Sequence, residues 1–238
     1  MPRYKRAAHV AFYVDESTLD TDAVETEEGS RIVVFFSKSK DKRDLREELG
    51  DLNWRRVLSN FYDSAITLGG STYATAEHAY HAAKYRCSDK PELAAIFALR
   101  AAAGGGGGGG GATVTNDPKT AKLAGGRRGM ALRGVRLDTR AWLEARERAM
   151  RAICEARWEQ DANFRRVLRV VNAKGWYLLH FERSGAKSFW GGFEKDGRVQ
   201  GRNALGEILM ELVTRSGGEE EAEPAAVTVA PKKAKVGD

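Results

Sequence analysis

Four side chains that can carry acid–base or nucleophilic chemistry recur at helical spacing in the first half of the chain. They stand at positions i, i+3, i+4 and i+7 and belong to Glu77, Tyr80, His81 and Lys84. A helix places such positions on one face, so the row forms either a ladder of ion pairs or one wall of a pocket. His78 adds a second imidazole, but the spacing is not His-Glu-x-x-His and no further ligand clusters here. No metal site is therefore expected.

A glycine-rich segment in the last quarter of the chain could hold a planar ligand. Trp190 is followed by two glycines, the first of which is Gly191. Glycine lets a backbone approach a ring on which the indole can stack. Asn203 stands where a helix is predicted to begin, which suits contacts to a sugar or a phosphate. The alternative is a structural turn around a core tryptophan. The pattern is not GxGxxG after a strand, so no Rossmann site is predicted.

These groups need regular elements to position them, and the hydrophobic pattern supplies candidates. Helices are predicted over residues 76–87, 91–103, 140–158, 162–172 and 205–213, with a further helix capped by Asp117 that stops at Gly125–Gly126. Strands are predicted over residues 9–14, 31–36 and 176–181, together with 67–73, which turns at Gly69–Gly70. The first two strands could pair as a hairpin across an acidic, structureless stretch, residues 15–30.

Composition limits the class of protein. The chain has 238 residues, of which 42% are apolar, and a formal net charge of +6, which is typical of a soluble globular protein. Only two cysteines, Cys87 and Cys154, occur, which fits a reducing compartment and excludes a disulfide framework. Neither a membrane-spanning run nor a secretory signal is expected. We expect a cytoplasmic location, and Lys232–Lys235 gives a weak hint of nuclear import.

Positive charge is concentrated in one segment. Residues 118–169 contain 14 Lys and Arg against 6 Asp and Glu, an excess of 8 that is larger than that of the whole chain. Either an anionic partner contacts this segment, or arginine-rich helices expose solvated outer faces.

Taken together, these motifs carry a family resemblance. They are, in chain order, Leu58–Tyr62, Tyr73–Tyr85, Ala121–Leu123, Trp190–Gly191 and Gly201–Glu211. Their combination resembles the NADAR family, also called YbiA-like. The resemblance implies a single compact, mainly helical α+β domain with a small antiparallel sheet over residues 31–215. Residues 1–30 are then an extension, 104–115 a flexible glycine insertion and 216–238 a disordered tail.

The same resemblance implies an enzyme that hydrolyses an N-glycosidic bond at a phosphorylated ribose. Family activities include removal of ADP-ribose from guanine and cleavage of early riboflavin-pathway intermediates. We expect the first, on a nucleotide or nucleic acid, with the second or a non-catalytic ADP-ribose-binding module as alternatives. No cofactor, metal or membrane partner is expected.

Site residues follow from the matched motifs. Glu77 and Lys84 are the expected catalytic residues: the carboxylate would stabilise an oxocarbenium-like state, and the amine would either form a Schiff base or bind phosphate or a ribose hydroxyl. The expected substrate-binding residues are Asn60, Phe61, Tyr80, His81, Arg127, Arg128, Trp190, Gly191, Asn203 and Gly206. The chain departs from the family at Lys187, where an acidic residue is usual, and this could change the choice of substrate.

Overall fold

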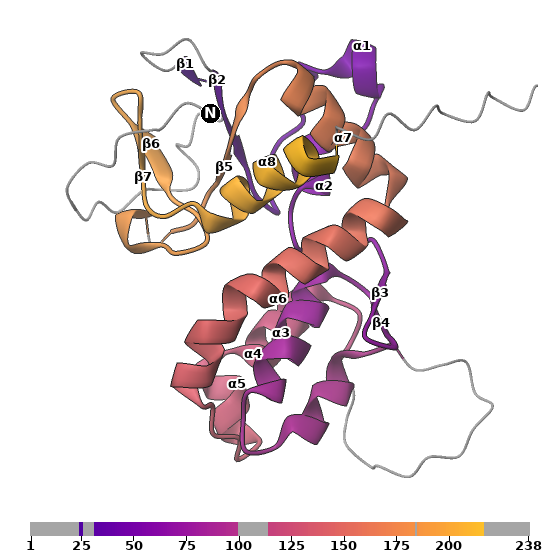
Figure 1. The fold of residues 1–238 in the computed structure, drawn as a ribbon, viewed down its shortest axis with the longest axis vertical. Helices are drawn as coiled ribbons and strands as arrows, with labels where there is room; N and C mark the ends of the chain where they lie inside the picture. Colours follow the sequence, from indigo (N-terminus) through magenta and orange to yellow (C-terminus); the bar gives the residue numbers. More distant parts are fainter. Residues whose placement is uncertain (1–23, 26–30, 100–113, 184, 217–238) are drawn as a thin grey trace, which may run out of the picture.

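The computed structural model describes residues 24–25, 31–99, 114–183 and 185–216. The predicted strand at residues 9–14, most of the glycine insertion and the tail from residue 217 onward lie outside these ranges. The described part has two halves, one above the other in Figure 1, and a long helix runs between them.

The upper half is built on a three-stranded sheet in the order β1-β2-β5. β1 (Val24–Glu25) pairs antiparallel with β2 (Arg31–Phe35), and β2 pairs parallel with β5 (Tyr177–His180). The expected small antiparallel sheet is therefore mixed, and the stretch predicted to be structureless contributes β1. A parallel partner far along the chain leaves no local turn signal, which explains why the sequence pattern did not reveal it.

Alternation along β2 gives the sheet two buried faces. Val33 and Phe35 pack in the core formed with α1 (Arg46–Leu49), α2 (Trp54–Val57), α7 (Ala162–Ala173) and α8 (Ala204–Ser216). Ile32 and Val34 pack on the other face, beneath the hairpin of β6 (Phe193–Lys195) and β7 (Arg198–Gln200). Because neighbouring strand residues point to opposite faces, a strand covered on both sides reads as a continuous apolar run.

The lower half packs around α3 (Ala76–Arg86). Its buried alanines and Tyr85 contact α4 (Pro118–Gly125), α5 (Arg127–Leu132) and the hairpin of β3 (Ile66–Leu68) and β4 (Ser71–Tyr73). The predicted helix over 91–103 is instead the 3₁₀ helix η1 (Pro91–Phe97). Val114, predicted to lie in the flexible insertion, is buried and donates its N–H to the Ile96 carbonyl.

Capping explains where two of the helices begin. The Asp117 side chain accepts from the Lys119 N–H, as predicted for α4, and Asp138 caps α6 (Thr139–Gln160) by accepting from the Ala141 N–H. Thr75 precedes α3 but does not cap it with its side chain. Its hydroxyl bonds His78 Nδ1 at 2.9 Å instead.

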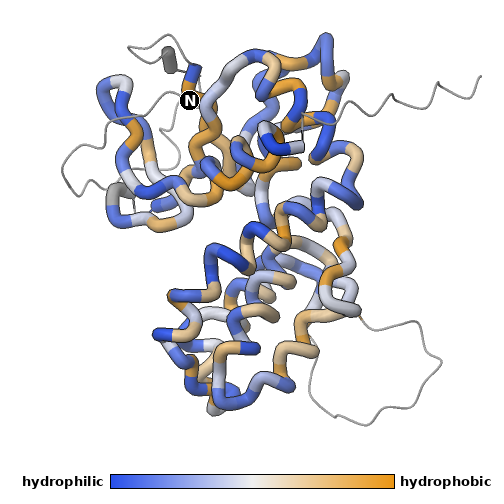
Figure 2. The backbone as a smooth tube through the Cα atoms, in the orientation of Figure 1, coloured by the Kyte–Doolittle hydropathy of each residue, from blue (hydrophilic) through white to orange (hydrophobic). Residues whose placement is uncertain are grey.

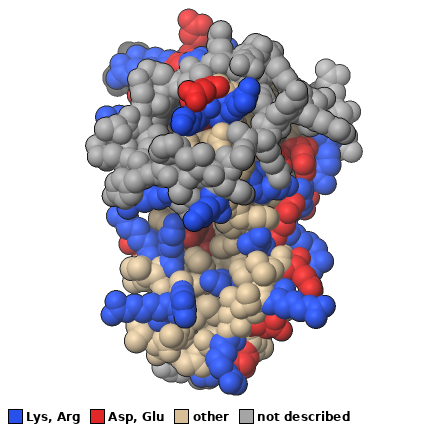
Figure 3. Space-filling view, turned by 90° about the vertical axis from the view of Figure 1, so that its left-hand side faces the viewer, with Lys and Arg blue, Asp and Glu red and all other residues tan. Residues whose placement is uncertain are grey.

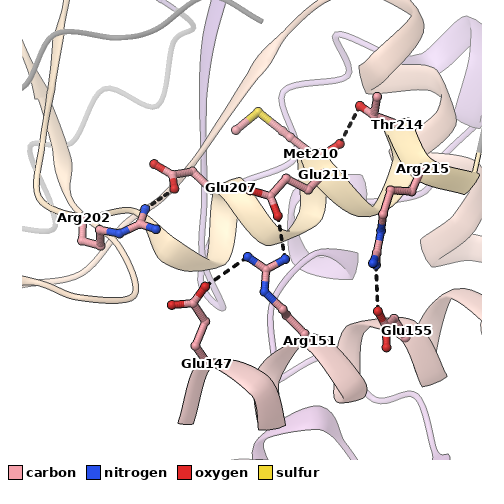
Figure 4. A network of polar contacts seen from close by, with 9 residues as sticks. All are labelled: Glu147, Arg151, Glu155, Arg202, Glu207, Met210, Glu211, Thr214 and Arg215. Atoms are coloured by element: carbon pink, nitrogen blue, oxygen red, sulfur yellow. Dashed lines mark hydrogen bonds and ion pairs between the residues drawn. The ribbon is translucent and has the colours of Figure 1, made fainter. Parts of the chain in front are cut away.

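Helix α6 joins the two halves: Ile153 packs in the lower core and Cys154 in the upper core. Its outer face is hydrophilic, as Figure 2 shows. Figure 4 shows the contacts that tie it to α8, in which Arg151 bridges Glu147 and Glu211 while Arg215 pairs with Glu155. A mainly helical α+β fold is thereby confirmed. Among the described residues, no helix has the length and apolarity that a membrane span needs.

Candidate active site

A cavity of about 870 Å³ brings together residues from both halves. Its walls include side chains from the turn after α2, the first turns of α3, helix α4 and the segments after β5. The members used below are Asn60, Phe61, Glu77, Tyr80, Lys122, His180, Glu182 and Trp190. Figure 3 shows Lys and Arg side chains at the waist of the molecule, between the two halves, and also over the lower half.

Glu77 is fixed in this cavity by its backbone and by its carboxylate. Its N–H donates to the Asn60 carbonyl at 3.0 Å, and its Oε1 lies 3.1 Å from His81 Nε2. An ionised carboxylate can only accept, so His81 Nε2 carries the hydrogen. Glu77 is only 8% exposed, and His81 Nδ1 is buried without a hydrogen-bond partner among the residues that the structure describes. The carboxylate is therefore oriented by one donor and keeps acceptor capacity for a ligand.

Tyr80 and Trp190 form the aromatic wall. Trp190 Nε1–H donates to the Tyr80 hydroxyl oxygen at 2.9 Å, and the two rings meet edge to face with centroids 5.6 Å apart. Burial raises the pKa of Tyr80 far above its ordinary value, because the phenolate would lose its hydration. The phenol consequently keeps its own hydrogen, which is available to donate to a ligand.

Two residues, the last of β5 and one just after it, join the site although the sequence motifs did not indicate them. Glu182 accepts a hydrogen bond from the Ser188 hydroxyl, whose oxygen in turn accepts from the Gly191 N–H at 2.8 Å. His180 faces the same cavity, and burial lowers its pKa. The sequence signal that could have indicated them is position, because one polar residue ends a buried apolar strand and the other comes shortly after it. Glu182 supplies a carboxylate near the segment where Lys187 replaces the usual acid, and Lys187 itself is exposed.

Comparisons with known proteins identify the family of this chain. A family model described as the NADAR domain matches residues 48–215. The chain belongs to the NADAR domain family. Proteins named N-glycosidase YbiA from Shigella flexneri are 27% identical over 76% of this chain and 86% of their own length. The Escherichia coli K12 protein of that name is 26% identical over the same shares.

One solved structure gives the same fold for the NADAR domain. The NMR structure of the Escherichia coli protein YbiA covers 86% of this chain and 95% of its own, with a TM-score of 0.51 and 22% identity. The likeness supports the α+β architecture described above, in which the cavity lies between the sheet half and the α3 half.

Within this NADAR domain, Lys84 and His81 lie behind the cavity wall rather than in it. Lys84 Nζ donates to the Gly125 carbonyl at 2.9 Å, and neither side chain lines the cavity. Burial lowers the pKa of the Lys84 amine, while Glu77 acts in the opposite direction. His81 packs against Gly125 so closely that a Cβ there would lie 2.0 Å from Nδ1. The expected helix face is thus split, with Glu77 and Tyr80 in the cavity and the other two at the α4 interface.

Three other residues expected to bind substrate lie within the packing of the domain. Asn203 is fully buried: its Oδ1 accepts from the His180 N–H, and its Nδ2 donates to Leu178 O and Tyr177 Oη. A Cβ on Gly191 would lie 2.1 Å from the His180 carbonyl, and one on Gly206 would lie 2.2 Å from that of Leu178. None of the three lines the cavity. They hold the segment before α8, and α8 itself, against β5.

The arginines expected to neutralise phosphate also lie elsewhere. Arg127 and Arg128 are exposed in the first turn of α5, outside the cavity. The cations that do line it are Lys38, Arg56, Lys119, Lys122 and Arg183. Lys122 also lies over the Phe61 ring, 5.6 Å from its centroid. The cationic character predicted for the site is present, but other side chains supply it. The described residues contain no cluster of His, Cys, Asp and Glu suited to a metal.

Proposed function

We propose that this protein is an N-glycosidase that hydrolyses the C1′–N bond between ADP-ribose and guanine, in a nucleotide or a nucleic acid. One observation carries the proposal: the Glu77 carboxylate shares a single cavity with aromatic rings and with cationic side chains. A ribosyl phosphate linked to a base needs these three kinds of partner. The relatives named N-glycosidase YbiA support the reaction class.

In this reaction the C1′–N bond breaks, its electron pair leaves with the base, and positive charge develops on the ribose. The Glu77 carboxylate stabilises that oxocarbenium-like state and accepts a proton from the attacking water as its oxygen bonds to C1′. His81 serves Glu77 as a positioning residue, because its Nε2–H orients the carboxylate from behind the cavity wall.

The departing base needs a proton or a hydrogen bond. The Tyr80 hydroxyl is suited to donate that hydrogen bond, because its oxygen already accepts from Trp190 and its own hydrogen has no acceptor among the described residues. Glu182 is a second carboxylate in the cavity, oriented by Ser188, and can accept from the amino groups of guanine or from a ribose hydroxyl. Lys122 and Lys119 at α4 are placed to neutralise phosphate.

The reaction can follow one of two routes: Lys84 attacks C1′ and forms a Schiff base, or water attacks C1′ directly. The lowered pKa of the Lys84 amine favours the neutral form that a Schiff base requires, but reaction at C1′ would need the amine to leave the Gly125 carbonyl. Reduction by borohydride during turnover separates the routes. A covalent adduct that Lys84→Ala prevents establishes the Schiff base. Cleavage without an adduct leaves direct attack by water.

Substrate choice is tested by incubating the protein separately with a guanine-ADP-ribosylated oligonucleotide and with a phosphoribosyl-pyrimidine metabolite. Release of ADP-ribose from the first, with the second left intact, supports the proposal. Cleavage of the second alone would replace it with a metabolic N-glycosidase. Binding of ADP-ribose without cleavage of either would make the protein a binding module.

A further inference from the structure

A second, smaller cavity adjoins the main one and has no part in the reaction described above. Its volume is about 300 Å³, at the lower end of the range of small-ligand pockets, roughly 300–1,000 Å³. The two cavities share the side chains of Ser37, Arg56, Ser59 and Phe61. We call it the second chamber. A ligand longer than one ribosyl unit could pass along this shared wall and occupy both.

The second chamber differs from the main cavity in charge. Lys119 and Lys122 line only the main cavity, whereas Asp63 and Tyr62 line only the second chamber. A carboxylate repels phosphate and accepts hydrogen bonds from amino groups. Phe61 and Tyr62 give the second chamber aromatic surface beside the Asp63 carboxylate, which is a hydrogen-bond acceptor. Proteins bind planar bases by stacking them on such aromatic side chains.

The polar groups of the second chamber differ in the partners they have. The Asp63 carboxylate makes no hydrogen bond or ion pair with any residue in the described ranges, whereas the Tyr62 phenol interacts electrostatically with the buried Arg157. Asn53 is different, because its Nδ2 donates to Ser39 O and its Oδ1 accepts from the Arg56 N–H. The second chamber thus combines a wall of satisfied groups with the Asp63 carboxylate, which is left available to a ligand.

Arg56 stands where the two cavities meet. Its Nε donates to the Ser39 carbonyl at 3.0 Å, which anchors the guanidinium. Its two Nη atoms make no hydrogen bond within the part of the chain that the structure describes. A guanidinium presented in this way matches phosphate oxygens in a bidentate fashion.

We infer that the second chamber binds a nucleobase with an exocyclic amino group, joined through phosphate at Arg56 to the ribosyl group in the main cavity. The inference rests on the proposed function and assigns a place in the protein to the base at the far end of its ADP-ribosyl substrate. Adenine fits the requirement, since its amino group can donate to Asp63 while its ring stacks on Tyr62. A lone phosphoribosyl pyrimidine would leave the second chamber empty.

Calorimetric titration with ADP-ribose, AMP and ribose 5-phosphate tests this inference. We expect ADP-ribose and AMP to bind more tightly than ribose 5-phosphate. Asp63→Asn and Tyr62→Ala should each weaken ADP-ribose by about tenfold and leave ribose 5-phosphate unchanged. Glu159→Gln, an exposed acid on α6, is the matched control for the charge change.

Equal affinity for AMP and ribose 5-phosphate would overturn the inference, as would variants that weaken both ligands equally. Titration is independent of turnover, so the two proposals can fail separately. If the two variants selectively lose affinity for ADP-ribose and no base-linked ADP-ribose is cleaved, the second chamber is confirmed as a base-binding site and the proposed glycosidase activity is wrong. If cleavage occurs, but Asp63→Asn and Tyr62→Ala bind ADP-ribose as tightly as the unsubstituted protein does, the glycosidase activity is confirmed and the base-binding role of the second chamber is wrong.

Discussion

The Asn60 carbonyl accepts the backbone N–H of Glu77 at 3.0 Å, so the loop that carries Asn60 and Phe61 is tied to the first turn of the helix that carries the carboxylate. The bond also satisfies one of the N–H groups that a helix leaves unpaired at its start. One wall of the cavity is thereby fixed relative to another, although 17 positions of sequence separate these two residues.

Arg157 supports the same loop from inside the protein. It is 2% exposed, its guanidinium donates to the carbonyls of Val57 and Ser59, and it lies over the Phe164 ring. Arg157→Met leaves these carbonyls without a donor and should lower the free energy of unfolding by about 3 kcal/mol. Urea denaturation of the variant and the unsubstituted protein measures this difference in the free energy of unfolding.

The control for this variant is Arg140→Ala, which removes an exposed guanidinium of the same helix that pairs with Glu144 on the surface. It should leave the unfolding midpoint nearly unchanged. If both variants unfolded at the same urea concentration as the unsubstituted protein, the account of Arg157 would be wrong.

Gly125 fits against His81 with no room for a methyl group. Gly125→Ala would put a Cβ 2.0 Å from His81 Nδ1, so the imidazole must move and its contact with Glu77 is lost. We expect a loss of stability of about 1–3 kcal/mol together with slower turnover. Thermal unfolding and single-turnover rates measure the two effects. At the neighbouring Gly126 the nearest atom to a Cβ is 3.3 Å away, so Gly126→Ala should be milder; the opposite order would contradict the packing argument.

Trp190 contributes both a ring and a donor to the cavity. Trp190→Phe keeps an aromatic ring but removes the bond to Tyr80, and should lower kcat/KM by about two- to tenfold. Trp190→Ala also removes the stacking surface and should lower it by about 10- to 100-fold. Trp158, which lies outside the cavity on α6, provides the control as Trp158→Phe. Equal kcat/KM for the two phenylalanine variants would count against the aromatic wall.

Asp44 gives the protein an acid-sensitive contact. Burial alone would raise the pKa of this carboxyl, but hydrogen bonds from Arg55 and Trp54 outweigh it and hold the pKa below the ordinary 3.8. A lowered folded pKa stabilises the protein fully above the unfolded value. The contribution is therefore lost as the pH falls from about 4 through the folded pKa.

The corresponding measurement is the free energy of unfolding between about pH 6 and pH 3. Asp44→Asn should be less stable at neutral pH and should show a shallower loss on the acid side, because the amide does not titrate. Asp41→Asn, an exposed neighbour, should keep the slope of the unsubstituted protein. Parallel curves for Asp44→Asn and the unsubstituted protein would refute the assignment.

How far the sequence predicts this molecule depends on the range of each interaction. Helical periodicity and capping placed α3, α4, α6 and α7 within a few residues, because those signals are local. The parallel pairing of β2 with β5 is not local and was missed. The 3₁₀ geometry of η1 was also missed, since its apolar pattern reads as an ordinary helix.

For the site, spacing alone predicted Glu77 beside Tyr80, and both line the cavity. It could not reveal that Lys84 turns toward Gly125, which depends on how α4 packs. Asn203 was expected to contact a sugar or a phosphate because it stands where a helix is predicted to begin. Its left-handed backbone, with φ 48°, and its three side-chain bonds give it a place in the core instead.

The central claim is that the Glu77 carboxylate drives cleavage of the bond between ADP-ribose and guanine. The most direct test follows ADP-ribose release from a guanine-ADP-ribosylated oligonucleotide by chromatography, for the unsubstituted protein, Glu77→Gln and the exposed control Glu144→Gln. We predict that the unsubstituted protein and Glu144→Gln release ADP-ribose at similar rates. Folded Glu77→Gln should release it about 100-fold more slowly than the unsubstituted protein, or slower still. Equal rates for all three, or no release by the unsubstituted protein, would contradict the account.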